Sequence, residues 1–293
     1  MPAARLHVLL ASLCFGTTGT AQALGPDAVP SAVGALRVVA GAALLLAVAR
    51  LARAPRPRAG TPLAVAAAGV AGYQLCFFAA VDDTGVAVGT VVALGSAPAF
   101  AGLGGWLLSG RLPGRTWAAA TTLAAAGVAL IAVAGAQADV SAPGVALAAG
   151  AGASYALFTL ASKALLDAGG TVEGVMAWAF TGGAVLLVPV LAVADLGWAW
   201  SGGGAAMVLW LAAVPTALAY LLFARGLRHL PAGDVATLTL AEPVTATVLG
   251  ATVLAERPGE GAIAGVVLVL AGLAVLAAGP EPEAAPAASG VAA

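Results

Sequence analysis

The residues of this chain that could do chemistry are few and stand in apolar surroundings. Glu242, which precedes Pro243, and Arg37 each interrupt a long apolar run. A charged side chain at the centre of a membrane helix costs about 2.5–3.5 kcal/mol on insertion scales. In a functional interpretation, Glu242 lines a hydrated cavity, where it holds a substrate ammonium or exchanges a proton. In a structural interpretation, it pairs with Arg37 or bonds the backbone groups freed by Pro243. Arg37 in turn either faces a substrate carboxylate or balances Glu242.

Further polar residues recur at helical spacing. Tyr155, Thr159 and Lys163 follow one another at every fourth position, which places them on one helix face. Bonding of a threonine to its own helix backbone and snorkelling of Lys163 to the lipid headgroups are the structural alternatives. Similar polar faces on several segments indicate a hydrated cavity among them. The predicted substrate-binding or coupling residues are Glu242, Arg37, Gln22, Tyr73, Gln74, Tyr155, Thr159, Lys163 and Tyr220.

The composition identifies the environment of the elements that carry these residues. The chain of 293 residues is 61% hydrophobic and 9% charged, with a mean hydropathy of +1.03. Soluble domains carry roughly 25% charged residues, so most of this chain is expected to lie in lipid. A net charge of −1 provides no basic footprint for nucleic acid. Cys14 and Cys76 lie inside apolar runs and are expected to pack as small apolar residues.

Ten apolar segments are long enough to cross a hydrocarbon core of ~30 Å as helices. The first resembles a signal peptide, with Arg5 and a cleavage-like Ala21-Gln22-Ala23, but we expect it to be retained because its loss would leave an unpaired set of nine. The predicted spans are 6–25, 31–50, 61–80, 85–108, 116–135, 143–165, 172–194, 204–224, 232–254 and 260–279.

Loop charges predict the orientation. Ten of the twelve basic residues fall on one side of this arrangement, Arg257 is on the other side, and Arg37 lies inside a span. By the positive-inside rule, both termini are expected in the cytoplasm. The ten basic residues are Arg5, Arg50, Arg53, Arg56, Arg58, Arg111, Arg115, Lys163, Arg225 and Arg228.

The last two spans have a second copy upstream. Pro98 and Pro243 lie 145 positions apart, and the same offset relates Gly127 to Gly272. This indicates an internal duplication, with repeats at 1–138 and 139–279 and a disordered tail at 280–293. Since five spans per repeat is an odd number, the second repeat must be inverted. The chain is thus predicted to be an all-α membrane protein of ten transmembrane helices in two inverted five-helix repeats.

Inverted repeats are a recurrent architecture of secondary transporters, whose substrates bind near the midplane between the repeats. We expect the cavity to be lined by spans one, three, four, six, eight and nine. Pro98 and Pro243 each remove a backbone donor at matching places, so they are hinge candidates for alternating access; static kinks are the alternative.

Several motifs follow one another in a characteristic order over nearly the whole chain: Arg37, Ser154-Tyr155-Ala156, Leu240-Ala241-Glu242-Pro243, Leu254-Ala255-Glu256-Arg257-Pro258, and Gly265 with Gly272. In this order and spacing they resemble the drug/metabolite transporter superfamily, and within it the EamA-type permeases. The resemblance implies a permease, commonly an exporter of amino acids, nucleosides or other small metabolites. One departure is that Arg111 occupies the position matching Glu256, where the family often has a second turn glutamate.

The sequence therefore predicts a carrier in the cytoplasmic membrane that exports a small metabolite, with an amino acid or a related compound favoured. A non-transporting membrane sensor or assembly protein, and an intramembrane enzyme, are the alternatives. The enzyme is disfavoured because HExxH and GxSxG motifs are absent and the only two histidines, His7 and His229, lie near span ends. No cofactor is expected, and the absence of a GxxxxGK[ST] loop excludes ATP-driven pumping by this chain. Gly85 and Gly89 have the spacing of a helix-contact motif, which leaves a homodimer open.

Overall fold

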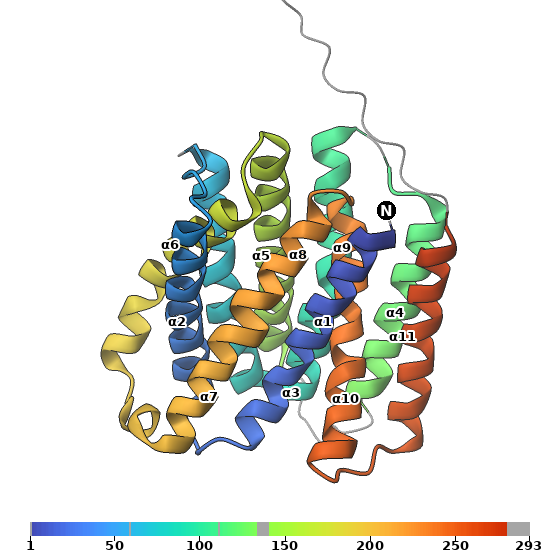
Figure 1. Ribbon diagram of the computed structural model, residues 1–293. Coiled ribbons are helices and arrows are strands. Elements are labelled where there is room, and N and C mark those ends of the chain that lie inside the picture. The colour runs from blue at the N-terminus through green and yellow to red at the C-terminus, as the bar shows by residue number, and fades with distance from the viewer. Residues whose placement is uncertain (1, 59, 111, 134–140, 280–293) are drawn as a thin grey trace, which may run out of the picture.

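The chain is a bundle of long helices in the computed structural model (Figure 1), which describes all residues except 1, 59, 111, 134–140 and 280–293. In chain order the elements are α1 (Pro2–Ala23), α2 (Pro30–Leu51), α3 (Thr61–Ser109), α4 (Arg115–Val133), α5 (Ala142–Asp167), α6 (Val172–Val193), the 3-10 turn η1 (Gly197–Trp200), α7 (Gly202–Ala212), the π-helical segment η2 (Ala213–Leu218), α8 (Ala219–Leu227), α9 (Ala232–Leu238), the 3-10 turn η3 (Thr239–Ala241), α10 (Glu242–Val253) and α11 (Glu260–Ala278).

The predicted all-helical, multi-span protein is confirmed for the described residues, which contain no strand. Nine helical segments in this part of the chain are long and apolar enough to cross a membrane. The remaining predicted span corresponds to α1, which has 22 residues but is more polar, with Arg5, His7 and Gln22 among them. The predicted tail at 280–293 and the predicted boundary between the repeats at 138–139 fall outside the described residues.

Short polar side chains define where three helices begin. Ser141, Thr171 and Ser201 precede α5, α6 and α7, and each side-chain oxygen accepts the backbone N–H three residues later. This N-cap geometry satisfies one of the backbone donors that a helix leaves free at its start. The loops before these helices therefore end at defined residues.

The third and fourth predicted spans form one element, α3, instead of two helices joined by a loop. Its backbone departs from helical dihedral angles at Gly85, with φ 78° and ψ 161°. Asp82 and Asp83, which we expected in a loop, are helical and exposed at this turn. Only glycine readily adopts such a conformation, so one residue replaces the loop. A Cβ atom added at Gly89 would lie 3.1 Å from Val81, which shows that the two arms of α3 fold closely together beside the turn.

The seventh to tenth helices are less regular. Within η2, Pro215 has no N–H to donate to the carbonyl of Leu211, and the hydroxyl of Thr216 donates to that carbonyl instead, at 2.7 Å. Further along, η3 interrupts the next span immediately before Glu242 and Pro243 begin α10. Irregular backbone is tolerated at membrane depth where other groups satisfy the freed polar atoms.

The helices α4 and α11 pack through small residues. A Cβ atom added at Gly127 would lie 2.6 Å from the carbonyl oxygen of Gly265, and one added at Gly272 would lie 2.6 Å from the carbonyl oxygen of Ala120. As the numbers rise along α4 they fall along α11, so the two helices are antiparallel. Ala120 and Gly265 are also 145 positions apart, as Gly127 and Gly272 are, so the contact is made twice in equivalent form.

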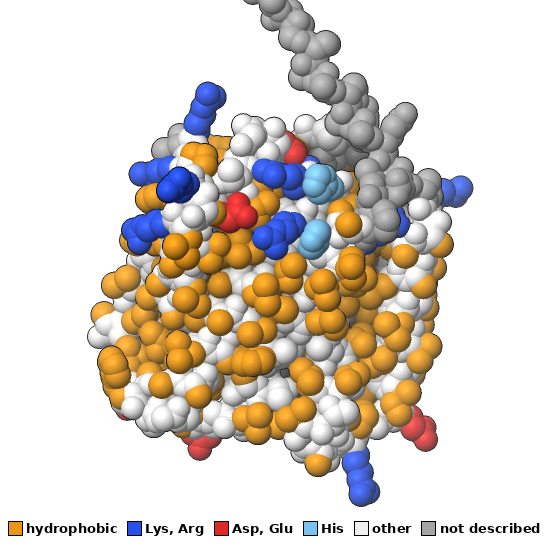
Figure 2. All heavy atoms as spheres, in the orientation of Figure 1, with side chains coloured by type: hydrophobic (Ala, Val, Ile, Leu, Met, Phe, Trp, Pro, Cys, Tyr) orange, Lys and Arg blue, Asp and Glu red, His pale blue; other side chains and the backbone are white. Residues whose placement is uncertain are grey.

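The surface separates into an apolar middle and polar ends. Hydrophobic side chains cover the middle of the molecule, and Lys and Arg side chains gather at the end that holds the N-terminus (Figure 2). Large apolar side chains such as Val185 and Leu209 are 64% and 66% exposed. Exposed apolar surface of this extent is expected of a protein that lies in a bilayer.

Candidate functional site

Aromatic rings from five helices converge inside the bundle. All three tyrosines of the chain take part: Tyr73 on α3, Tyr155 on α5 and Tyr220 on α8. The ring centroids of Tyr73 and Tyr155 are 6.2 Å apart, and those of Tyr220 and Phe180 are 4.4 Å apart. Phe15 adds an edge-on contact to Tyr220 at 5.0 Å. Such contacts hold the rings in defined orientations.

A small cavity lies within this cluster. It receives side chains from α2, the first arm of α3, α5, α6, η2 and α8. The space open to the centre of a water molecule is about 20 Å³, which corresponds to one or two water molecules. The lining residues are Arg37, Val38, Gly69, Val70, Tyr73, Gln74, Tyr155, Phe158, Phe180, Thr216 and Tyr220.

Two polar atoms among the lining residues have no protein partner. Nε of Arg37 and Oε1 of Gln74 are buried and make no hydrogen bond with any described residue. The other end of the Gln74 amide is fixed, since its Nε2 donates to the carbonyl of Gly34 at 2.9 Å. Leaving a buried polar group unsatisfied costs roughly 1–3 kcal/mol. A donor and an acceptor without partners in one cavity are therefore available to a ligand or to water.

Other polar groups around the cavity are already engaged. The hydroxyl of Tyr155 donates to Oγ1 of Thr239 in η3 at 3.2 Å, which connects the cavity wall to the irregular backbone before Glu242. Thr216 is held by its bond to Leu211. The hydroxyl of Thr159 donates to the carbonyl of Tyr155 at 2.8 Å and is fully buried. Thr159 therefore bonds its own helix, as one of the two sequence interpretations has it.

Glu242 lies beside the cavity but is not among its lining residues. It begins α10 and packs near Gly16 of α1. No residue in the described part of the chain forms an ion pair with it within 4.0 Å. Its charge nevertheless lies within electrostatic range of Arg37 and of Tyr73. Glu242 and Arg37 are thus near one another but form no ion pair.

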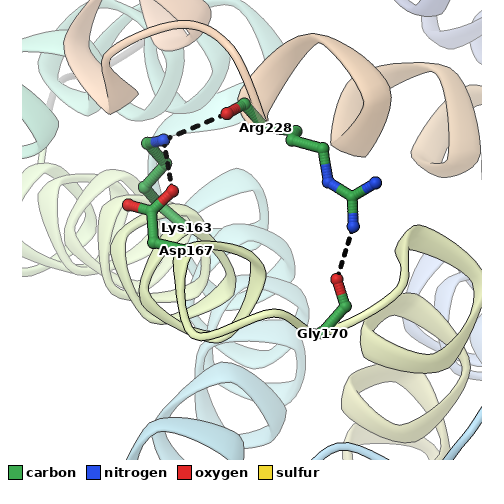
Figure 3. A network of polar contacts seen from close by, with 4 residues as sticks. All are labelled: Lys163, Asp167, Gly170 and Arg228. Atoms are coloured by element: carbon green, nitrogen blue, oxygen red, sulfur yellow. Dashed lines mark hydrogen bonds and ion pairs between the residues drawn. The ribbon is translucent and has the colours of Figure 1, made fainter. Parts of the chain in front are cut away.

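Lys163 and Gln22 lie away from this cavity. Nζ of Lys163 bonds Oδ1 of Asp167 at 2.6 Å and the carbonyl of Arg228 at 3.3 Å. The Arg228 guanidinium donates to the carbonyl of Gly170 at 2.6 Å, so the turn after α5 is connected to the turn after α8 (Figure 3). Nε2 of Gln22 donates weakly to the carbonyl of Thr18 on its own helix, at 3.4 Å.

The structure brings five of the nine predicted site residues to one cavity: Arg37, Tyr73, Gln74, Tyr155 and Tyr220. The lining elements differ from those expected. Spans two and seven contribute through α2 and α6, whereas spans one, four and nine contribute no lining residue.

Phe158 and Phe180 also line the cavity and were not predicted to do so. In a helix that is apolar on every side, an aromatic residue facing a cavity is indistinguishable from one facing lipid. The only available signal was that Phe158 follows Tyr155 by three positions and so shares its helix face.

No metal site accompanies this cavity in the part of the chain that the structure describes, where no three His, Cys, Asp or Glu side chains gather. The lining instead combines one cation, one amide, two hydroxyl-bearing residue types and aromatic rings. Binding sites for small molecules commonly have this composition, with mostly apolar walls and a few polar groups. The fold and the cavity together define a polytopic helical membrane protein with a small polar site inside its bundle.

The chain belongs to the EamA-like transporter family. The family model matches it twice, over residues 3–133 and 142–278. The resemblance to EamA-type permeases inferred from sequence motifs is therefore confirmed. The chain is also 40% identical over 281 residues to the "Uncharacterized transporter YwfM" of Bacillus subtilis (strain 168), with 95% of each chain covered. These relationships support the broad conclusion that the protein is a membrane transporter.

A solved crystal structure with a similar arrangement of helices is among the chains that match. It superposes with a TM-score of 0.82 and covers 94% of this chain and 96% of the other, at 23% sequence identity. At that level of identity the similarity concerns the arrangement of helices and carries no information about cargo.

Proposed function

We propose that the protein is a secondary transporter that exports a small carboxylate-bearing metabolite, an amino acid or a related compound, across the cytoplasmic membrane by alternating access. The observation that carries the proposal is the pair of unpartnered polar atoms in the aromatic cavity, Nε of Arg37 and Oε1 of Gln74. The guanidinium provides donors for a carboxylate, and the amide oxygen accepts from an ammonium or N–H group. The rings of Tyr73 and Phe180 offer apolar contact to the rest of the molecule.

The size of the cavity supports a transport cycle with at least two shapes. A space of about 20 Å³ for water-molecule centres holds no metabolite, whereas sites for small molecules usually enclose about 300–1,000 Å³. The helices must therefore separate around the cavity to admit cargo. Pro98, inside α3, and Pro243, at the start of α10, remain the proposed bending points.

The packing of α4 against α11 supports the inverted arrangement of the repeats at 1–138 and 139–279. The two helices occupy equivalent places in the repeats, and their glycine contacts run antiparallel. Two such halves place the proposed site between them, as in other inverted-repeat transporters. At the basic end the start of α1 meets the end of α11, where Arg5 donates to the carbonyl of Ala277. By the positive-inside rule this end faces the cytoplasm.

Glu242 is the proposed coupling residue. A carboxylate near the cavity, without an ion pair among the described residues, is free to exchange a proton when the surrounding helices move. A gradient would then supply the energy for export.

Efflux from proteoliposomes tests the proposal. A mixed load of amino acids and nucleosides is followed with and without an imposed pH gradient, for the wild type, Arg37→Gln and Glu242→Gln. The exposed residues Arg257 and Glu260 provide matched controls, Arg257→Gln and Glu260→Gln. Charge-assisted hydrogen bonds contribute about 1.5–3 kcal/mol. We therefore expect Arg37→Gln to raise the half-saturating cargo concentration roughly ten- to a hundredfold.

The two variants have separate meanings. Gradient-accelerated efflux of a carboxylate-bearing cargo that is lost in Glu242→Gln, with folded yield intact, supports both the carrier and its coupling residue. If efflux does not depend on the gradient in either the wild type or Glu242→Gln, the protein is still a carrier and Glu242 has a structural role. Unchanged saturation in Arg37→Gln contradicts the carboxylate site. An absence of efflux for every compound favours the sensor or assembly alternative.

A further inference from the structure

A second cavity opens on the outside of the bundle, between α3 and α6. It is an open depression of about 340 Å³ that begins at the end of α3 that follows the arginine-rich segment 50–58. We name it the Arg56 groove. Its lining residues are Arg56, Gly60, Leu63, Ala64, Ala67, Trp178, Thr181 and Gly182.

Small residues explain why the groove exists. A Cβ atom added at Gly182 would lie 2.6 Å from Cβ of Ala67, so α3 and α6 are in direct contact there and form the floor. Gly60 and Ala64 leave space between the helices on the side toward the helix ends. Six residues from Thr61 to Ala67 advance about 9 Å along a helix. The groove therefore extends from the end of α3 to a depth typical of the headgroups and upper acyl chains.

The mouth of the groove holds a fixed and uncompensated positive charge. The guanidinium carbon of Arg56 lies 4.1 Å from the ring centroid of Trp178, which is a cation–π contact. No described carboxylate pairs with Arg56, since the two ion pairs in the described part of the chain are Lys163–Asp167 and Arg225–Glu173. The tryptophan ring restricts the position of the guanidinium but accepts none of its hydrogen bonds. Its exposed N–H donors are therefore available to the anionic oxygens of a ligand.

An apolar path continues from the groove along α6. Val185 and Val188 follow Thr181 at the fourth and seventh positions, on the same helix face. They are 64% and 53% exposed. The hydroxyl of Thr181 is turned to its own helix, where it donates to the carbonyl of Ala177 at 2.6 Å. Below Arg56 the surface is therefore apolar and open toward the bilayer.

We propose that the Arg56 groove is a binding site for one anionic phospholipid. Its phosphate lies against Arg56 and Trp178, and an acyl chain follows Leu63 and Ala64 toward Val185. Charge complementarity and the continuous apolar path identify the occupant, because a soluble anion needs no apolar path and a neutral lipid needs no fixed cation. The site shares no lining residue with the central cavity, so it is separate from the site proposed for the cargo.

Lipid retention by the purified full chain tests the site. The protein is reconstituted in nanodiscs of phosphatidylcholine with and without phosphatidylglycerol, and bound lipid is counted by native mass spectrometry. Wild type is compared with Arg56→Gln and with Arg58→Gln, which removes the same charge from an exposed residue outside the groove. Arg56→Gln removes the charge-assisted hydrogen bonds that the guanidinium would make to the phosphate, so this variant should retain roughly tenfold less phosphatidylglycerol than wild type. Arg58→Gln should retain nearly as much as wild type.

A second variant tests the shape of the Arg56 groove separately from its charge. Ala64→Leu partly fills the groove and leaves Arg56 in place, so it should also lower retention of phosphatidylglycerol while the elution volume of the folded protein stays unchanged. Equal losses in Arg56→Gln and Arg58→Gln would show general surface attraction and overturn the proposal. Full retention by Ala64→Leu, or displacement of the lipid by soluble glycerol phosphate, would overturn it as well. The same conclusion follows if wild type binds no more phosphatidylglycerol than phosphatidylcholine.

Discussion

The two halves of the chain reverse direction differently at equivalent places. In the first half, Gly85 alone turns α3 back on itself. In the second half, the corresponding reversal is a separate turn between α8 and α9. There the Arg228 guanidinium donates to the carbonyl of Gly170, and the backbone carbonyl of Arg228 accepts from Lys163. The helices on either side of this second turn also contain a π-helical and a 3-10 segment, η2 and η3.

Equal sequence spacing therefore does not impose equal local structure on the two halves. Pro98 and Pro243 lie 145 positions apart, yet Pro98 is inside α3 and Pro243 is at the start of α10. The irregular segments of the second half adjoin the central cavity through Thr216 and Thr239. The first half contributes the cation and the amide of the cavity on regular helices. The two halves therefore have the same arrangement of helices but contribute different groups to the cavity.

The largest loss of stability is expected from a substitution at the Gly85 turn. Gly85→Val places a β-branched residue at φ 78°, and backbone in such regions costs about 1–3 kcal/mol, so the loss of stability should lie near the upper value. Thermal unfolding in detergent measures it. Gly105→Ala on the same helix is the control, since a Cβ atom there meets nothing within 4 Å. A Gly85→Val protein as stable as the control would contradict the proposed backbone strain.

A somewhat smaller loss of stability is expected at the contact between α4 and α11, where the two halves have equivalent structure. Gly127→Ala and Gly272→Ala each force a Cβ atom against a backbone carbonyl at 2.6 Å. Overpacking of this kind costs typically about 1–3 kcal/mol. Because the two contacts are equivalent, the two variants should lose similar stability in the same unfolding assay. A loss confined to one of them would show that α4 and α11 do not meet symmetrically.

The smallest change in stability is expected from replacing Pro98 and Pro243, and it should differ between the two. Pro98→Ala restores a backbone donor in the interior of α3 and should stabilise the protein by about 1 kcal/mol, the net value of one hydrogen bond. Pro243→Ala should change stability less, because the first turn of a helix tolerates proline. Unfolding temperature and efflux rate are measured together. If both prolines are hinges, both variants slow efflux despite their different stabilities; unchanged rates would identify static kinks.

Sequence patterns predicted the class of the protein and five residues that line the candidate cavity. Long apolar segments reveal membrane helices because the bilayer requires about 20 apolar residues for each span. Arg37 and Gln74 stood out because polar groups are costly in lipid. The reversal at Gly85 was not predicted, since the chain contains 39 glycines and composition does not reveal which one adopts a positive φ. The π-helical segment around Pro215 was missed because proline in a membrane helix is compatible with several backbone geometries.

The reciprocal contact between α4 and α11 has a consequence for assembly. Between the subunits of an oligomer such a contact is called isologous, because each side presents the equivalent surface to the other; here the two sides are α4 and α11. Gly127 meets Gly265, and Gly272 meets Ala120, the residue equivalent to Gly265. Two separate copies of the first half could make the same contact as a two-fold dimer. Joining the halves in one chain turns that bimolecular encounter into an intramolecular one, whose effective concentration is set by the linker and not by expression level.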